Sequence, residues 1–167
     1  MNDTTISAID ALIASFEKNT YAEKHVISLL HYLVELDAKE EKQTIDAIIK
    51  VLGFCTKDFV RAPIMNALTS IDASNPIKAS LLAVCWESGL DYNNYLNAFV
   101  EALIKGNEAV AIEAYTMILE FTEKTEKIKE AIENINSTDQ KNYSPAHRIL
   151  INDSLQHLIN LYNSNPL

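Results

Sequence analysis

Histidine and cysteine, the side chains that most often bind metals or act in acid–base catalysis, are few and scattered in this sequence. The 4 histidines fit none of the usual metal-binding patterns, because there is no HExxH motif, no Glu-x-x-His pair and no His-Asp pair. His25 and His31 are six positions apart, about 240° around a helix, so they do not share a face. Cys55 and Cys85 are 30 positions apart, which matches no zinc spacing. We therefore expect no bound metal and no cofactor.

Nucleophilic and acid–base chemistry is equally hard to place. The sequence has no GxSxG motif, and its 3 isolated glycines cannot form a phosphate-binding loop. Glu87 and Asp91 flank Gly89 and would meet across a turn, but a solvated helix end is the simpler interpretation, because paired acid–base catalysis needs a buried cleft. The apolar settings of the two cysteines favour buried, reduced thiols over a disulfide or a redox pair. We predict that the protein is not an enzyme.

The most unusual stretch is CWESGLDYNNYLNAF, residues 85–99, which holds the one tryptophan of the chain and three asparagines. One interpretation is a joint between packed helices, with Trp86 against Tyr92 or Tyr95. The other is a binding site in which Trp86 and Tyr92 form an exposed aromatic anchor beside the asparagines. We prefer the joint and keep the site as the alternative.

The polar residues of this stretch extend the alternative. On a continuous helix, Asn93, Asn97 and Glu101 would stand at i, i+4 and i+8 and share one polar stripe. Such a stripe would hydrogen-bond a partner peptide. The candidate partner surface therefore comprises Trp86, Tyr92, Asn93, Asn97 and Glu101.

The charge of the chain is acidic. Its 23 Asp and Glu residues outnumber 14 Lys and Arg, for a net charge of −9. Such a surface repels phosphate groups, so we expect neither nucleic acid nor an anionic membrane as a partner. No apolar run approaches the roughly 20 residues of a membrane span, and the first residues lack the basic start of a secretory signal. We expect a cytoplasmic protein.

Apolar residues recur at helical spacing almost throughout the chain, which predicts an all-α fold. The 3 glycines, Gly53, Gly89 and Gly106, fall where the helical patterns stop. Gly53 is expected to end its helix with a positive φ.

Other residues predict where helices begin. The pair Asn75-Pro76 is typical of a helix start, with Asn75 as the N-cap. Asp91 and Asn107 are expected to cap two later helices. A further helix is expected over residues 56–71, with a kink or a late start because it contains Pro63.

The spacing of these units suggests a repeat. Gly53 and Gly89 are 36 positions apart, and the apolar patterns before them coincide at that offset. In these features the chain resembles the HEAT and armadillo class of helical repeats. The resemblance implies a single domain over residues 1–167, a right-handed α–α superhelix of about eight helices in stacked antiparallel hairpins, or HEAT-like α-solenoid. The hairpins would span about 3–36, 39–72 and 75–122, followed by capping helices within 123–163; residues 123–137 would continue the seventh helix or form their own.

The resemblance also implies protein binding. We therefore expect a non-enzymatic protein–protein interaction module, or a small scaffold or adapter, with an unidentified protein partner. One alternative is a small-molecule-binding or enzymatic helical domain with a pocket between the fourth, fifth and sixth helices. The other is a structural subunit that forms a homodimer through an exposed apolar edge.

Overall fold

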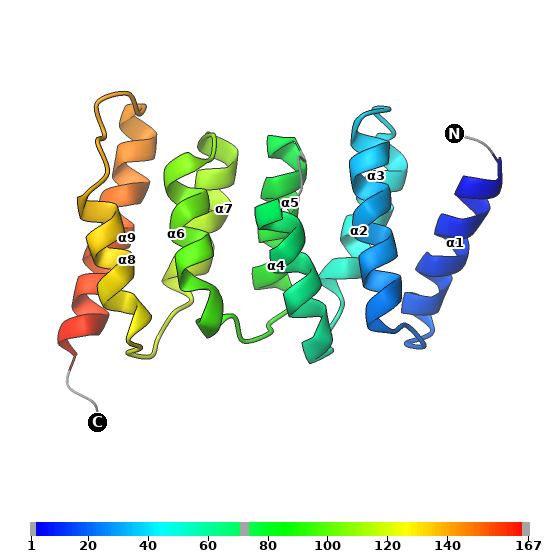
Figure 1. Ribbon diagram of the computed structural model, residues 1–167, viewed down its shortest axis with the longest axis horizontal. Coiled ribbons are helices and arrows are strands. Elements are labelled where there is room, and N and C mark those ends of the chain that lie inside the picture. Colours follow the sequence, from blue (N-terminus) through cyan, green and yellow to red (C-terminus); the bar gives the residue numbers. More distant parts are fainter. Residues whose placement is uncertain (1–2, 71–73, 165–167) are drawn as a thin grey trace. The chain divides into compact units, whose positions relative to one another are not determined.

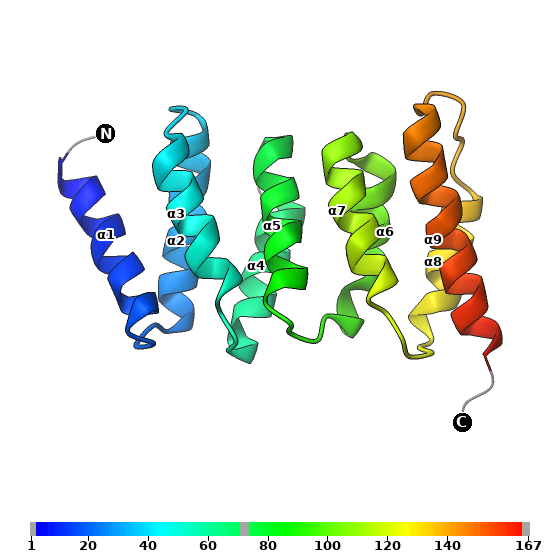
Figure 2. The same ribbon diagram turned by 180° about the vertical axis from the view of Figure 1, so that it is seen from behind.

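The computed structural model describes residues 3–70 and 74–164 of the 167-residue chain. Within these ranges the chain forms nine α-helices and two short 3-10 helices, with no strand (Figures 1 and 2). The prediction of an all-α fold is therefore confirmed. The superhelical arrangement, the hairpin bounds and the single domain remain predictions.

The packing divides the chain into two compact units, residues 1–90 and 91–167. The first unit contains α1 (Asp3–Glu17), α2 (Glu23–Asp37), α3 (Lys42–Gly53), the 3-10 helix η1 (Asp58–Val60), α4 (Arg61–Ser70) and α5 (Asn75–Glu87). The second unit contains the 3-10 helix η2 (Asn93–Tyr95), α6 (Leu96–Lys105), α7 (Glu108–Leu119), α8 (Lys127–Asn136) and α9 (Pro145–Asn163).

In the first unit the helices form two layers. α2 packs against α3 and α4 packs against α5, while α2 also contacts α4 and α3 contacts α5. Figure 1 views this unit from the side of α2 and α4, and Figure 2 from the side of α3 and α5. α1 lies against α2 and α3. The core is aliphatic, and its fully buried side chains include Ile9, Leu29, Leu33, Leu36, Ile48, Leu52, Ile64, Leu81 and Leu82.

A lysine ties two turns of this unit together. The Lys57 ammonium donates to the backbone carbonyls of Asn19, at 3.2 Å, and Tyr21, at 3.3 Å. It also lies 4.1 Å from the centre of the Tyr21 ring, close enough for a cation–π interaction. The Tyr21 ring in turn stacks on Phe16 of α1, with 4.3 Å between ring centroids. The turn after α1 is therefore anchored to the segment after α3.

The second unit also consists of two hairpins. α6 packs against α7 and α8 packs against α9, while α6 contacts α8 and α7 contacts α9. Phe99 is fully buried at the centre and meets the rings of Tyr92 and Phe121 edge-on. α8 is a helix of its own, because α7 ends at Leu119 and α8 begins only at Lys127. Of the two alternatives for residues 123–137, the separate helix is the one found.

Several predicted helix ends are confirmed and others are wrong. Asn107 caps α7 as expected, because its side-chain oxygen accepts the Val110 N–H at 3.0 Å. The N-cap of α5 is Ser74 and not Asn75, which is already helical. Asp91 does not cap α6: its carboxylate accepts the Asn93 N–H at 2.8 Å in the turn before α6, and the N-cap of η2 is Tyr92.

Proline and glycine account for two further differences. Helix α4 starts late, at Arg61, which places Pro63 in its first turn, where the missing N–H costs no helical hydrogen bond. The predicted end at Ile71 lies outside the described residues. Gly89 has a φ of +62°, but Gly53 does not have the positive φ that we predicted. Gly53 is instead the last residue of α3.

Candidate functional site

An open cleft lies between the C-terminal ends of α3 and α5 in the first unit and is called here the α3–α5 cleft. Its volume is about 650 Å³. Helix α3 contributes its last two turns and the residue that follows, and α5 contributes its last two residues. The lining residues are Asp46, Ile49, Lys50, Gly53, Phe54, Trp86 and Glu87.

Two aromatic side chains on this cleft face solvent. Phe54 is 76% exposed and Trp86 is 44% exposed. Single exposed apolar residues are common, but two large aromatics on one cleft are typical of a protein-binding surface. Tryptophan is also enriched among the residues that dominate binding energy.

The cleft carries more negative than positive charge. Asp46 and Glu87 are acidic and Lys50 is basic. Among the described residues neither carboxylate takes part in an ion pair. The last turns of α3 and α5 add partial negative charge, because the carbonyl ends of both helix dipoles lie here.

The Glu87 carboxylate lies close to the backbone of Gly53, where a larger residue would leave no room for it. A Cβ atom at position 53 would lie 2.8 Å from Glu87 Oε2, closer than real Cβ atoms come to another atom. The absent side chain therefore lets the end of the Glu87 side chain lie against the last turn of α3. This close approach, and not a positive φ, is what glycine provides at position 53.

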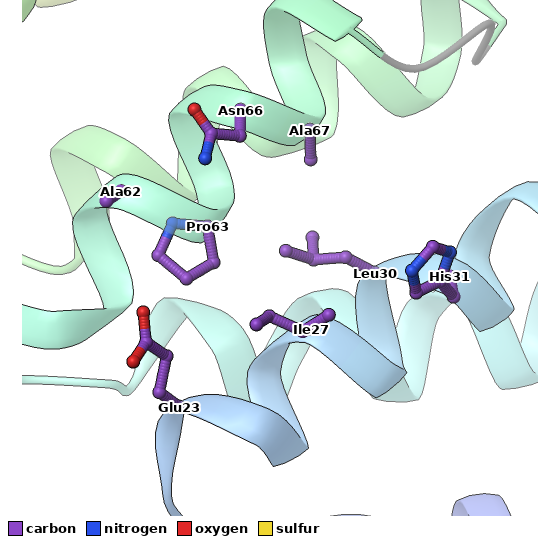
Figure 3. A pocket seen from close by; sticks show the side chains of 8 residues that line it. All are labelled: Glu23, Ile27, Leu30, His31, Ala62, Pro63, Asn66 and Ala67. Carbon is purple, nitrogen blue, oxygen red and sulfur yellow. The ribbon is translucent and has the colours of Figure 1, made fainter.

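A second, smaller groove lies on the other layer of the first unit, between α2 and α4 (Figure 3). Its volume is about 300 Å³. Figure 3 shows Ile27 and Leu30 of α2 facing Pro63 and Ala67 of α4. The polar groups lie at the edges, and no pair of them is placed for acid–base chemistry: Glu23 and His31 come from opposite ends of the groove in Figure 3. This α2–α4 groove is suited to a small apolar group.

The second unit has a polar groove of about 520 Å³ between α6 and α8. Asn97 of α6 donates its side-chain N–H to Glu130 of α8 at 2.7 Å. The Asn97 carbonyl oxygen is buried without a hydrogen-bond partner among the described residues. Glu101, one turn later, pairs with Lys105. In this groove Asn97 ties two helices together.

The structure distributes the five predicted surface residues over both units. Trp86 belongs to the first unit and the other four belong to the second. Tyr92 is only 3% exposed and packs its ring near those of Tyr95 and Phe99, so an exposed anchor that includes Tyr92 is wrong.

The predicted polar stripe is also interrupted. Asn93 lies in η2, before α6 begins at Leu96, so Asn93 does not share one helix with Asn97 and Glu101. Asn97 is half-buried and Glu101 is exposed. Of the five predicted residues, Trp86 alone lies on the α3–α5 cleft.

Sequence reasoning missed Phe54 and Asp46. An apolar residue just after a helix usually packs back on the helix, so nothing marked Phe54 as exposed. The predicted repeat did hold a usable signal, because its offset of 36 maps Lys50 onto Trp86. Equivalent positions of successive hairpins lie side by side in a stacked repeat, and these two residues do line one cleft.

The two cysteines are buried and are not joined in a disulfide. The Cys55 thiol donates to the Val51 carbonyl, and the Cys85 thiol to the Leu81 carbonyl, both at 3.2 Å. Burial raises the pKa of Cys55 to about 11, so the thiol is un-ionised and poorly nucleophilic at neutral pH.

Neither a metal centre nor a membrane segment is found in residues 3–70 and 74–164. No three His, Cys, Asp or Glu side chains of these ranges are grouped closely enough to hold a metal ion. None of the helices described combines the length and the apolar character that crossing a bilayer requires. Comparisons with protein-family models, with curated proteins and with solved structures find no match to this chain.

Proposed function

We propose that this chain is a non-enzymatic protein-interaction module, a small scaffold or adapter, that holds a peptide segment of its partner in the α3–α5 cleft. The observation that supports this function best is the exposure of Phe54 and Trp86 on one cleft of the first unit. The resemblance to HEAT and armadillo repeats, the right-handed superhelix and the cytoplasmic location belong to the same proposal.

The size of the aromatic surface is sufficient for useful affinity. A partner that covers the exposed 76% of Phe54 and 44% of Trp86 removes roughly 260 Å² of side-chain area from water. At about 25 cal/mol per Å² this contributes about 6 kcal/mol, before the entropic costs of association are subtracted. The cleft therefore suits a transient, micromolar partner better than a permanent one.

The experiment is selection of binders from a library of random displayed peptides, followed by titration of a synthetic selected peptide. Peptide binding should alter the fluorescence of Trp86, which is the one tryptophan of the chain. Phe54→Ala should weaken binding at least about tenfold, because it removes a central aromatic contact.

The matched control is Ile149→Ala in α9 of the second unit, which truncates a 59% exposed apolar side chain that is not among the residues lining the cleft. This variant should bind the peptide as wild type does. Failure to select any peptide, or equal binding by Phe54→Ala, would refute the proposed function. Light scattering at tens of micromolar protein tests the homodimer alternative. If wild type is a dimer and Phe54→Ala is a monomer, a second copy of the chain occupies the cleft.

The α2–α4 groove favours a second candidate function, the binding of a small apolar molecule. Its volume of about 300 Å³ is at the lower end of the range of ligand pockets, and its floor is apolar. Hexanol is a suitable probe, with the Ile27 methyl resonances as the readout. Hexanol should change the chemical shifts of the Ile27 methyl groups in wild type, and Ala67→Leu should fill the groove and abolish these changes. Chemical-shift changes that persist in Ala67→Leu would exclude the groove as the binding site.

A further inference from the structure

We propose that the segment bound in the α3–α5 cleft carries a positively charged side chain, an arginine, next to an apolar residue. This inference rests on the proposed function and names the chemistry of the partner.

The α3–α5 cleft carries a net negative charge. Two carboxylates, Asp46 and Glu87, line it together with one ammonium, Lys50, and neither carboxylate takes part in an ion pair among the described residues. One negative charge is therefore left without a matching cation on the lining of the cleft. The carbonyl ends of α3 and α5 add to its negative potential.

The position of the Glu87 carboxylate also favours a cation on this cleft. Gly53 leaves room for this group against the last turn of α3, on the same cleft as Phe54 and Trp86. A cation that reaches Glu87 from solvent therefore binds on a cleft that two exposed aromatic residues also line. A cation in contact with an aromatic ring loses water, and its attraction to a carboxylate becomes stronger.

A carboxylate and two aromatic residues on one cleft favour arginine over lysine. A guanidinium is planar, stacks on aromatic faces and donates two parallel hydrogen bonds to a carboxylate. A lysine ammonium offers a point charge and holds its water more strongly. The net charge of −9 further favours encounter with basic partners and opposes phosphorylated or otherwise anionic ones.

The test compares peptides selected on wild type with peptides selected on the double variant Asp46→Asn/Glu87→Gln, from one library of random displayed peptides. Wild type should enrich arginine beside leucine or an aromatic residue, and the double variant should lose the arginine enrichment while keeping the apolar one. A synthetic wild-type-selected peptide is then titrated against the Trp86 fluorescence, in parallel with the same peptide carrying citrulline in place of arginine. Citrulline has nearly the same shape without the charge.

The loss of the peptide's arginine charge and the loss of the two carboxylates of the protein should have non-additive effects on the binding free energy. Citrulline should weaken binding to wild type about tenfold or more, and should change binding to the double variant little. Gly53→Ala, which displaces the Glu87 carboxylate without removing its charge, should give an intermediate loss. Lys50→Gln should strengthen binding, because it removes the one competing cation of the cleft.

The outcomes separate the inference from the function on which it rests. Peptides that need Phe54 but show no arginine enrichment, and that bind Asp46→Asn/Glu87→Gln with unchanged affinity, would overturn the inference and leave the proposed function in place. Peptides that bind Phe54→Ala as well as wild type, or a selection that returns no binder, would overturn both.

Discussion

Replacing Phe54 by alanine should hardly weaken the fold, whereas the same replacement of Phe16 should weaken it severely. Phe54 is 76% exposed, so only about 50 Å² of an aromatic side chain of about 200 Å² is buried by folding. At about 25 cal/mol per Å² the loss is about 1 kcal/mol, and this is an upper bound because the unfolded chain already buries some area. Phe16 is 7% exposed and stacked on Tyr21, so its truncation should cost about 3–5 kcal/mol.

The assay is urea unfolding of both variants and of wild type. Both positions lie in the first unit, and so does the one tryptophan, so Trp86 fluorescence follows the unfolding of that unit. The free energies of unfolding should differ between the two variants by at least about 2 kcal/mol. A Phe54→Ala variant as unstable as Phe16→Ala would mean that the Phe54 ring is buried. Phe54 would then not be available to a partner on the α3–α5 cleft.

Three further predictions concern pH, a helix cap and a turn. Burial raises the pKa of the Cys55 thiol to about 11 and that of the Tyr21 hydroxyl to about 12, so the folded state holds these protons more tightly than the unfolded state does. The contribution of these two groups to the free energy of unfolding should be constant below about pH 9, and the free energy of unfolding should fall as the pH rises from about 9 toward 11, as urea unfolding at a series of pH values would measure. A rise in stability over that interval would contradict the assignment. Asn107→Ala should cost about 1 kcal/mol in thermal unfolding, because it removes the acceptor of the Val110 N–H, while Asn107→Asp should cost much less; equal losses would argue against the cap. Gly89→Ala should cost about 1–2 kcal/mol because φ is +62°, with Gly89→Asn better tolerated, and an unchanged midpoint in urea for Gly89→Ala would refute the left-handed turn.

Helix positions were the most predictable part of the fold, because they depend on local patterns. The apolar residues at helical spacing along the chain identified an all-α fold, and Asn107 identified the start of α7. Predictions failed where a neighbour along the chain competes for the same role. Ser74 is the N-cap in place of Asn75, and Pro76 at the second helical position still costs no helical hydrogen bond, because the first four N–H groups of a helix have no partner within it.

The candidate site was only partly predictable. Trp86 stood out by its rarity, and it lies on the α3–α5 cleft. Phe54 and Asp46 did not stand out, because exposure at the end of a helix depends on how far the neighbouring helix extends over it. Tyr92 was assigned to a surface although it is buried, since an aromatic residue beside asparagines has the same local pattern in either setting.

The hairpin packing of each unit has a kinetic consequence. The main contacts of every helix are with the next helix along the chain or the one after it. Only short loops must close before such contacts form, so the entropic cost of loop closure is small. Each unit should therefore fold rapidly for its length, in milliseconds or less, as proteins of low contact order do. Because each hairpin forms from segments that are neighbours in sequence, folding of a unit can begin in more than one of its hairpins.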